Sequence, residues 1–127
     1  MVVKVVFGWR DHPGRSAEEC ERHYRSVHMK LAEKAYDGVD GFVALAYDRV
    51  RAHAVNDHNE PRRIEREPDM DAWCELWFRD EESMAAAFRL PGMKVLFDDH
   101  VNFMDVDSAS NIRIYHVDET VFLGTRP

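Results

Sequence analysis

A nine-residue segment at positions 71–79, Asp-Ala-Trp-Cys-Glu-Leu-Trp-Phe-Arg, restricts the fold more than any other part of the chain. Its aromatic and aliphatic residues occupy both odd and even positions, whereas a strand with one solvated face alternates between apolar and polar side chains. One side of such a strand carries Trp73, Glu75 and Trp77, and the other carries Cys74, Leu76 and Phe78. We therefore expect a strand whose sheet is covered on both faces.

Local signals predict the other strands and the helices. Runs of β-branched and aromatic residues indicate strands at 2–9 and 42–50, and an alternating pattern indicates a last strand that starts at 112 and extends to 123. Ser16 and Glu19 form a capping box, and Gly38 is the next glycine or proline, so a helix is expected from about 17 to about 35. Acidic residues at 80–82 begin a second helix, which Pro91 and Gly92 interrupt before it resumes over about 93–101.

The resulting order is strand, helix, strand, strand, helix, strand. This is the split βαβ pattern of an α+β domain, in which two helices pack on one face of a four-stranded antiparallel sheet. The helices cover only one face. Because the segment 71–79 requires cover on the other face as well, an identical sheet from a second copy is the economical solution, and we expect a homodimer.

Length and charge limit the class of protein. The 127 residues are expected to form one domain, residues 1–127, with a single core. With 17 basic and 24 acidic residues, the net charge of −7 argues against nucleic acid and anionic membranes as partners. No apolar run is long enough for a signal peptide or a membrane span, so a cytoplasmic location is expected.

Residues 51–68 differ in composition from the rest of the chain. The segment is rich in charged residues and contains Pro61 and Pro68, which is typical of an exposed connection. We expect a charged loop that acts as a flap.

His28 is the strongest candidate for chemistry. It follows Tyr24 by one helical turn on the apolar stripe of the first helix, and a half-buried imidazole can exchange a proton near neutral pH. The alternative is a core histidine with one hydrogen bond. Asp99 could orient His28 as a carboxylate orients a general base. Alternatively, Asp99, Asn102 and Asp105 could satisfy backbone donors where the chain turns.

Aromatic residues could form the walls of a flat apolar site, although such residues are more often plain core. Glu75 either meets a basic partner, such as an arginine across the dimer, or lines the pocket. His100 is expected to face solvent, although it adjoins Asp99. The candidate binding residues are Phe7, Trp9, Tyr47, Trp73, Glu75, Trp77, Phe88, His100, Asn102 and Phe103.

Metal and cofactor motifs are weak. His23 and His28 are separated by about 140° around an α-helix, so their side chains should diverge. Cys20 and Cys74 form neither a disulfide framework nor a zinc spacing and are expected to be buried thiols. A weak site at His53, Asp57 and His58 matches no zinc motif. No metal or cofactor is expected.

Four stretches resemble one known family. They are residues 16–32, with Tyr24, Val-His and Leu-Ala; residues 74–80, with Glu-Leu-Trp-Phe; residues 99–105, with Asp, Asn-Phe and Asp; and the last strand. These stretches resemble EthD-domain proteins, in the dimeric α/β-barrel superfamily of ferredoxin-like folds. The resemblance implies a dimer whose sheets pair into a barrel. Relatives include cofactor-independent enzymes that act on aromatic, polyketide-like or lactone compounds, haem-using branches, and members without assigned activity.

These observations favour a cofactor-independent enzyme that acts on a small apolar molecule by isomerisation, cyclisation, dehydration or decarboxylation. His28 would move the proton, and Tyr24 and Asp99 would assist by hydrogen bonding. The alternative is a non-catalytic ligand carrier or an accessory protein to an oxygenase. A minor alternative is a haem-binding relative with His28 or His116 as the axial ligand.

Overall fold

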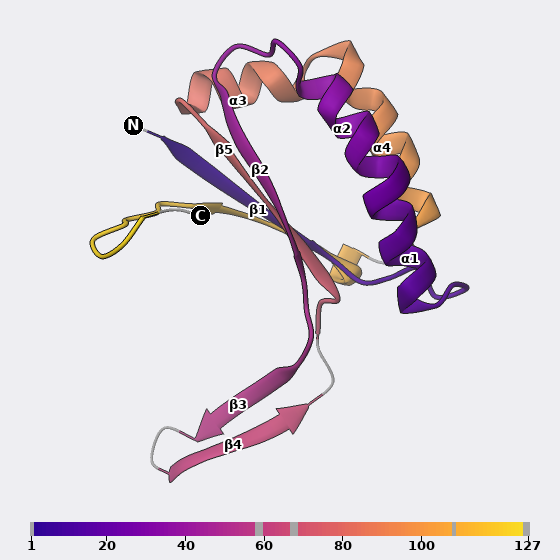
Figure 1. Ribbon diagram of the computed structural model, residues 1–127, viewed down its shortest axis with the longest axis vertical. Coiled ribbons are helices and arrows are strands. Elements are labelled where there is room, and N and C mark those ends of the chain that lie inside the picture. The colour runs from indigo at the N-terminus through magenta and orange to yellow at the C-terminus, as the bar shows by residue number, and fades with distance from the viewer. Residues whose placement is uncertain (1, 58–59, 67–68, 108, 126–127) are drawn as a thin grey trace.

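The computed structural model describes residues 2–57, 60–66, 69–107 and 109–125, with only the backbone described at 53–57 and 60–66 (Figure 1). Four antiparallel strands form one sheet in the order β2-β5-β1-β6. Their bounds are Val3–Trp9 for β1, Phe42–Arg49 for β2, Ala72–Phe78 for β5 and Ile112–Val117 for β6. With all helices on one side of this sheet in Figure 1, the expected α+β, ferredoxin-like architecture is confirmed.

The first helical segment runs without a break from residue 17 to residue 36. It consists of α1 (Ala17–His23), a π-helical turn η1 (Tyr24–His28) and α2 (Met29–Tyr36). The capping box is present, because the Ser16 hydroxyl accepts from the Glu19 backbone N–H at 3.1 Å and the Ser16 N–H donates to the Glu19 carboxylate at 3.4 Å. The predicted helix is confirmed, and the π-helical turn within it was not predicted.

The second helical segment is broken where Pro91 and Gly92 predicted. It comprises α3 (Glu81–Phe88), the short 3-10 turn η2 (Pro91–Met93), α4 (Lys94–Asp99) and a second 3-10 turn η3 (His100–Asn102). Asp80 caps α3 by accepting a hydrogen bond from the Ser83 N–H at 2.7 Å. The break lets α4 turn and lie alongside α1 and α2, so the two helical segments form one layer over the sheet (Figure 1).

Residues between β2 and β5 form a hairpin rather than a loop. The strands β3 (His53–Asp57) and β4 (Glu60–Arg66) pair with each other and project away from the sheet (Figure 1). The expectation of a loop over 51–68 was therefore wrong for residues 53–57 and 60–66, because local antiparallel pairing satisfies their backbone groups in spite of the charged composition and Pro61. Residues 58–59 and 67–68 lie outside the described residues.

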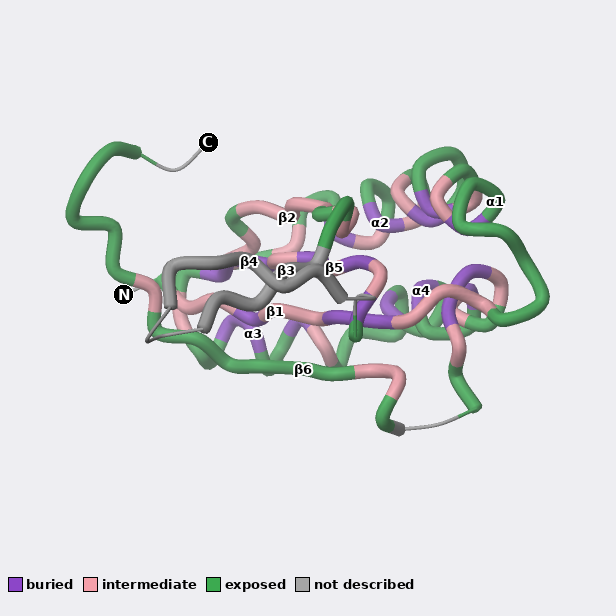
Figure 2. The backbone as a smooth tube through the Cα atoms, turned by 90° about the horizontal axis from the view of Figure 1, so that it is seen from below, coloured by how far each residue is buried: buried purple, intermediate pink, exposed green. Residues whose placement is uncertain are grey.

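The last strand is shorter than predicted. β6 ends at Val117, which pairs with Lys4 near the start of β1. Residues 118–123, expected to continue the strand, have no strand structure, since β1 itself begins at Val3 and offers no further backbone partner. The burial colouring of Figure 2 shows that β6 is largely exposed along its length. A short η4 turn (Ala109–Asn111) precedes it.

The core lies between the sheet and the helices. Its fully buried members include Trp9, Cys20 and Phe78, and both cysteines are buried free thiols. On the opposite face, the ring of Trp73 lies over Gly8, where an added Cβ would approach it to 2.5 Å. Gly8 is therefore required for this close approach of strand and ring. None of the described helices is both long and apolar enough to cross a membrane.

Candidate functional site

A cavity of about 290 Å³ lies between the sheet and the helices. Its walls are mainly aliphatic and aromatic, and they come from all four strands of the sheet and from both helical segments. The polar groups on its wall are three histidines and two tyrosines: His28, His100, His116, Tyr24 and Tyr36. We call this space the His28 cavity.

His28 ends the π-helical turn and is 8% exposed. Its Nδ1 lies 2.8 Å from Oδ2 of Asp99 at the end of α4. Burial lowers the pKa of His28, and the hydrogen bond to the Asp99 carboxylate opposes this effect only in part. In the neutral imidazole, Nδ1–H donates to Asp99, and Nε2 then carries the lone pair.

Asp99 accepts hydrogen bonds from three side chains. His28 binds one carboxylate oxygen, whereas the other receives His23 Nε2 at 2.8 Å and Asn102 Nδ2 at 2.9 Å. Burial raises the pKa of Asp99, but the hydrogen bonds from Asn102 and the two histidines outweigh it and hold the pKa below its ordinary value. Asp99 is therefore ionised at neutral pH.

Of the two aspartates that could satisfy backbone donors where the chain turns, Asp105 is the one that does so. Asp105 accepts from the N–H of Asp107 at 3.1 Å and from the side chain of Asn111 at 2.9 Å. It thus fixes the turn that leads toward β6, as an Asx-type acceptor does. The recorded partners of Asp99 are side chains of the first helical segment and of η3.

The expectation that His23 and His28 diverge was wrong. The backbone N–H of Met29 donates to the carbonyl of Tyr24, which is the i to i+5 bond of a π-helical turn. This wider turn brings side chains five residues apart toward one side, and both imidazoles reach the same carboxylate.

In the described part of the chain, no three or more His, Cys, Asp or Glu residues are grouped so as to hold a metal ion.

His100 does not face solvent as expected. It lines the His28 cavity, with its ring 5.6 Å from that of His28 and 5.6 Å from that of Phe7. Burial, with a smaller effect of His28, lowers the pKa of His100 to about 4. His100 is therefore uncharged at neutral pH and places a neutral hydrogen-bonding group beside His28.

Tyr24 is the central ring of an aromatic stack. Its ring lies 4.2 Å from Tyr47, 5.1 Å from His28 and 5.3 Å from Trp9. Burial raises the pKa of Tyr24, so its hydroxyl remains protonated. Tyr24 can therefore donate a hydrogen bond but does not act as a base at neutral pH.

The other candidate residues divide into three groups. Phe7 and Phe88 line the His28 cavity. Behind its wall lie Trp9, Tyr47 and Phe103, packed on Tyr24 or His28, and Asn102, bound to Asp99. The structure does not bring the third group, Trp73, Glu75 and Trp77, to this site, since their parity on β5 directs them to the opposite face of the sheet.

Glu75 has a basic partner within its own chain. Its carboxylate lies 2.6 Å from Lys4 Nζ, and Lys4 also binds Glu119 at 3.0 Å. The ammonium group lies 4.9 Å from the centre of the Trp77 ring, whose Nε1–H donates to Glu119 at 3.1 Å. The residues that follow β6 are thereby tied to the opposite face of the sheet.

Sequence reasoning left several cavity residues out of the candidate binding residues, above all His116, which it named only as a possible haem ligand. On β6, His116 pairs with Val5 and shares the parity of Ile112 and Ile114, which pair with Trp9 and Phe7. Two isoleucines on the same parity as a histidine were a signal for the helix-covered face. The missed members on α4 include Leu96 and Phe97.

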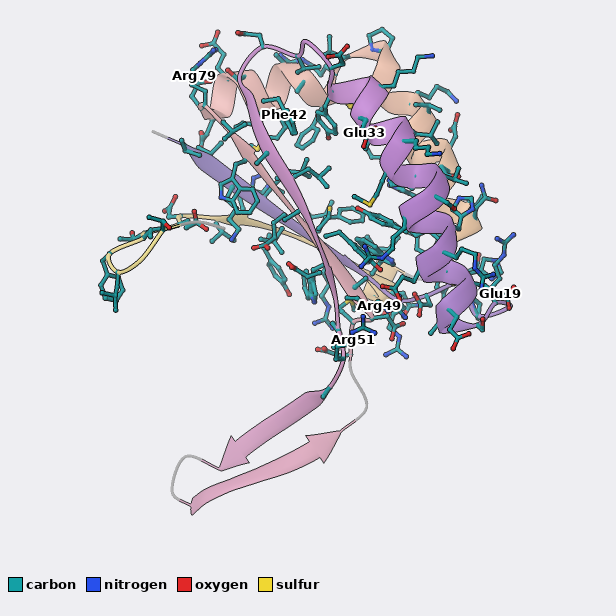
Figure 3. All side chains as sticks on the ribbon, in the orientation of Figure 1. Glu19, Glu33, Phe42, Arg49, Arg51 and Arg79 are labelled. Carbon is teal, nitrogen blue, oxygen red and sulfur yellow. The ribbon has the colours of Figure 1, made fainter. Side chains whose placement is uncertain are left out.

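A second cavity, of about 510 Å³, lies at the edge strand β2. Glu33 of α2 and Phe42 of β2, both labelled in Figure 3, contribute to its wall. Tyr36 lines both cavities and stacks on Phe42 at 4.6 Å. No histidine lines this second cavity, so we place the candidate site in the His28 cavity.

Solved structures share this fold. An EthD family protein from Bacillus halodurans has a TM-score of 0.60 and 18% identity over 94% of this chain and 100% of its own. SnoaB of Streptomyces nogalater, described as a cofactor-independent oxygenase, has a TM-score of 0.63 and 13% identity over 98% of each chain. A dimeric ferredoxin-like protein of unknown function from Jannaschia has a TM-score of 0.63 and 10% identity over 94% of this chain and 100% of its own.

Sequence comparison assigns the family. No curated protein matches the sequence. The EthD domain family matches residues 12–107, which include the first helical segment, β2, β5, α4 and all three members of the His23, His28 and Asp99 cluster. The chain therefore belongs to the EthD domain family.

Proposed function

We propose that the protein is a cofactor-independent enzyme that moves a proton at a small, largely apolar substrate bound in the His28 cavity. One observation carries this proposal: a buried imidazole, held at Nδ1 by an ionised carboxylate, lies on the wall of a mainly apolar cavity. A general base needs this combination of a fixed tautomer, a nearby countercharge and access to the substrate.

The proton transfer begins with neutral His28. Nε2 takes a proton from an acidic C–H or phenolic O–H of the substrate, and the positive charge that forms on the ring is stabilised by Asp99. The substrate becomes an enolate or phenolate, and its negative charge lies opposite the new imidazolium. Return of the proton from the imidazolium to a different atom completes an isomerisation. In a dehydration, the enolate expels a hydroxyl group, which takes the proton from the imidazolium and leaves as water. In a decarboxylation, loss of carbon dioxide itself forms the enolate, and protonated His28 then gives it a proton.

Two neutral donors support the same step. Tyr24 keeps its phenolic proton, because burial raises its pKa, and can donate to a substrate oxygen on which charge develops. His100 is uncharged at neutral pH and can bind a second polar atom without competing for the proton. A planar aromatic, polyketide-derived or lactone substrate with its oxygen atoms at one end suits this division between apolar and polar wall.

A homodimer is part of the proposal. The opposite face of the sheet presents Tyr115 and Val117 at 48% and 36% exposure, and β6 is an open edge among the described strands. A second copy that packs on this face would cover these apolar groups, and the similar protein from Jannaschia is described as dimeric. Light scattering coupled to size-exclusion chromatography measures the mass, and a monomer at micromolar concentration would contradict this part.

The catalytic part is tested with hydroxylated two-ring and three-ring aromatic ketones and lactones as probes. Binding is followed by tryptophan fluorescence, and turnover is followed by absorbance and, because SnoaB is an oxygenase, by dioxygen uptake. The His28→Gln variant should still bind a substrate that the natural protein converts, but its kcat should fall by a factor of about 100 to 10,000.

The matched control is His12→Gln, which removes an imidazole outside the cavity, one that accepts from the Gly14 N–H. Its kcat should equal that of the natural protein. Full turnover by His28→Gln would refute the role of His28. Tight binding of the probes without conversion by the natural protein would favour the alternative, a ligand carrier or accessory protein.

A further inference from the structure

His23 has no place in the proton transfer described above, yet it is bound to the same carboxylate as His28. It is absent from the wall of the His28 cavity, and its side chain is 18% exposed, whereas that of His28 is 10% exposed. The distances from each imidazole to Asp99 are equal, at 2.8 Å, and each uses a different oxygen. Asp99 therefore bridges one histidine on the cavity wall and one outside it.

The bridge depends on the backbone. In a regular α-helix, side chains five residues apart point about 140° away from each other, so one carboxylate could not bind both. The π-helical turn Tyr24–His28 removes this divergence. Single π-helical turns inside α-helices often occur at functional sites, and here the turn places the two imidazoles on one acceptor.

The packing around the bridge restricts its movement. Phe103 contacts both imidazoles: its ring stacks with that of His23 at 5.9 Å and meets that of His28 edge to face at 4.7 Å. Asn102 donates to the same oxygen of Asp99 as His23 does. The carboxylate thus has donors on both oxygens, and its orientation is fixed from two directions.

We propose that His23 is a positioning residue that acts through Asp99 and limits how strongly the carboxylate holds the imidazole of His28. A carboxylate that already accepts from His23 and Asn102 has less of its negative charge available to stabilise the protonated form of His28. His23 thus helps to hold the orientation of Asp99 and at the same time draws on the negative charge that His28 uses. This inference rests on the proposed function only in so far as His28 is the base.

The expected consequence is a change in the titration of His28. Its charged and titratable neighbours are Asp99, His23, His100 and Tyr24, and both Asp99 contacts and burial act on its pKa. Without the His23 donor, Asp99 binds the protonated form of His28 more strongly. The pKa of His28 should then rise by about 0.5 or more.

The experiment compares variants by ¹⁵N NMR of histidine-labelled protein over a pH series. His23→Leu removes the donor and keeps apolar bulk beside Phe103, whereas His23→Gln keeps an N–H at nearly the same reach. His23→Leu should show the upward shift of the His28 titration, and His23→Gln should restore more than half of the difference. His12→Gln is the matched control and should leave His28 unchanged.

An unchanged His28 titration in a folded His23→Leu variant would overturn the inference, as would equal shifts in the Leu and Gln variants. If His23→Leu fails to fold, His23→Asn replaces it, because its shorter amide does not reach Asp99. The acidic limb of the kcat profile should move by the same amount as the titration. Since the NMR readout needs no substrate, a shift without turnover would refute the proposed function and leave this inference standing.

Discussion

The two faces of the sheet handle their charged groups in different ways. On the helix-covered face, one carboxylate, Asp99, is surrounded by three neutral or weakly basic donors and borders a cavity. On the opposite face, Lys4 lies between Glu75 and Glu119, and the groups compensate one another as ion pairs beside Trp77. In the first arrangement, only Nδ1 of His28 is bound to the carboxylate, and Nε2 is left for the proposed proton transfer. In the second arrangement, the charged groups are paired with one another.

The difference also appears in the pKa values. Burial is the first cause on both faces, but it lowers the pKa of His100 to about 4 on the helix-covered face and, together with the Glu75 carboxyl group, raises that of Asp48 to about 6 on the other. Both shifts favour the uncharged form. The same physical effect therefore weakens a base in the cavity and weakens an acid outside it.

The largest expected effect comes from breaking the helix-covered arrangement at Asp99. Asp99→Leu removes the acceptor of three donors, and leaving them unpaired should lower the free energy of unfolding by about 3 kcal/mol. Glu75→Gln, on the opposite face, should cost less than about 1 kcal/mol, because ion pairs near solvent contribute little. Urea denaturation of both variants measures the difference. Equal losses would show that the two faces do not differ in this respect.

A smaller effect is expected from steric disruption of the opposite face. A methyl group at Gly8 would collide with the Trp73 ring, so Gly8→Ala should lower the free energy of unfolding by about 1 to 3 kcal/mol. Gly92→Ala is the matched control, since an added Cβ there meets nothing within 4 Å. Thermal unfolding of the two variants measures the effect. A Gly8→Ala protein as stable as the natural one would mean that Trp73 can leave β1 without cost.

The smallest effect distinguishes the faces by the sign of their pH dependence. His100 binds its proton at an ordinary pKa of 6.5 when unfolded and at about 4 when folded, so its contribution is present above 6.5 and is lost as the pH falls toward 4. Asp48 has an ordinary pKa of 3.8 and a raised value of about 6, so its contribution is present below 3.8 and is lost as the pH rises through 6.

Two variants measure these opposite slopes by chemical denaturation between about pH 4 and about pH 7. His100→Gln should remove the loss on the acidic side, and Asp48→Asn should flatten the decline on the neutral side. For each variant, the pH slope of the stability difference from the natural protein is compared. If the two slopes had the same sign, the two faces would not differ in their pH dependence.

Regular periodicity explains what the sequence could predict. The helical spacing placed Tyr24 and His28 on one face, and the parity of 71–79 separated Trp73, Glu75 and Trp77 from Cys74, Leu76 and Phe78. Parity does not say which side the helices cover, so Trp73, Glu75 and Trp77 were assigned to the same candidate site as His28. The pairing of Asp99 with His28 was a hypothesis from the family resemblance and local chemistry, and the structure places the two within 2.8 Å.

Departures from regular geometry explain what the sequence could not predict. The π-helical turn has no sequence signal as clear as a capping box, and without it the shared contact of His23 and His28 with Asp99 could not be inferred. The orientation of His100 depends on the 3-10 turn η3, whose side chains do not follow the spacing of the preceding α4. The β3 and β4 hairpin was hidden by its composition.

The hairpin leaves and rejoins the sheet at one place. After β2 ends at Arg49, the backbone N–H of Val50 still donates to the carbonyl of Asp71, just before β5, at 3.0 Å. The hydrogen bonds between β2 and β5 therefore continue up to the point where the hairpin begins. Doubling the length of chain between these two strands would cost only about 0.6 kcal/mol of loop-closure entropy. At this junction the chain can therefore gain or lose residues without opening the ladder between β2 and β5.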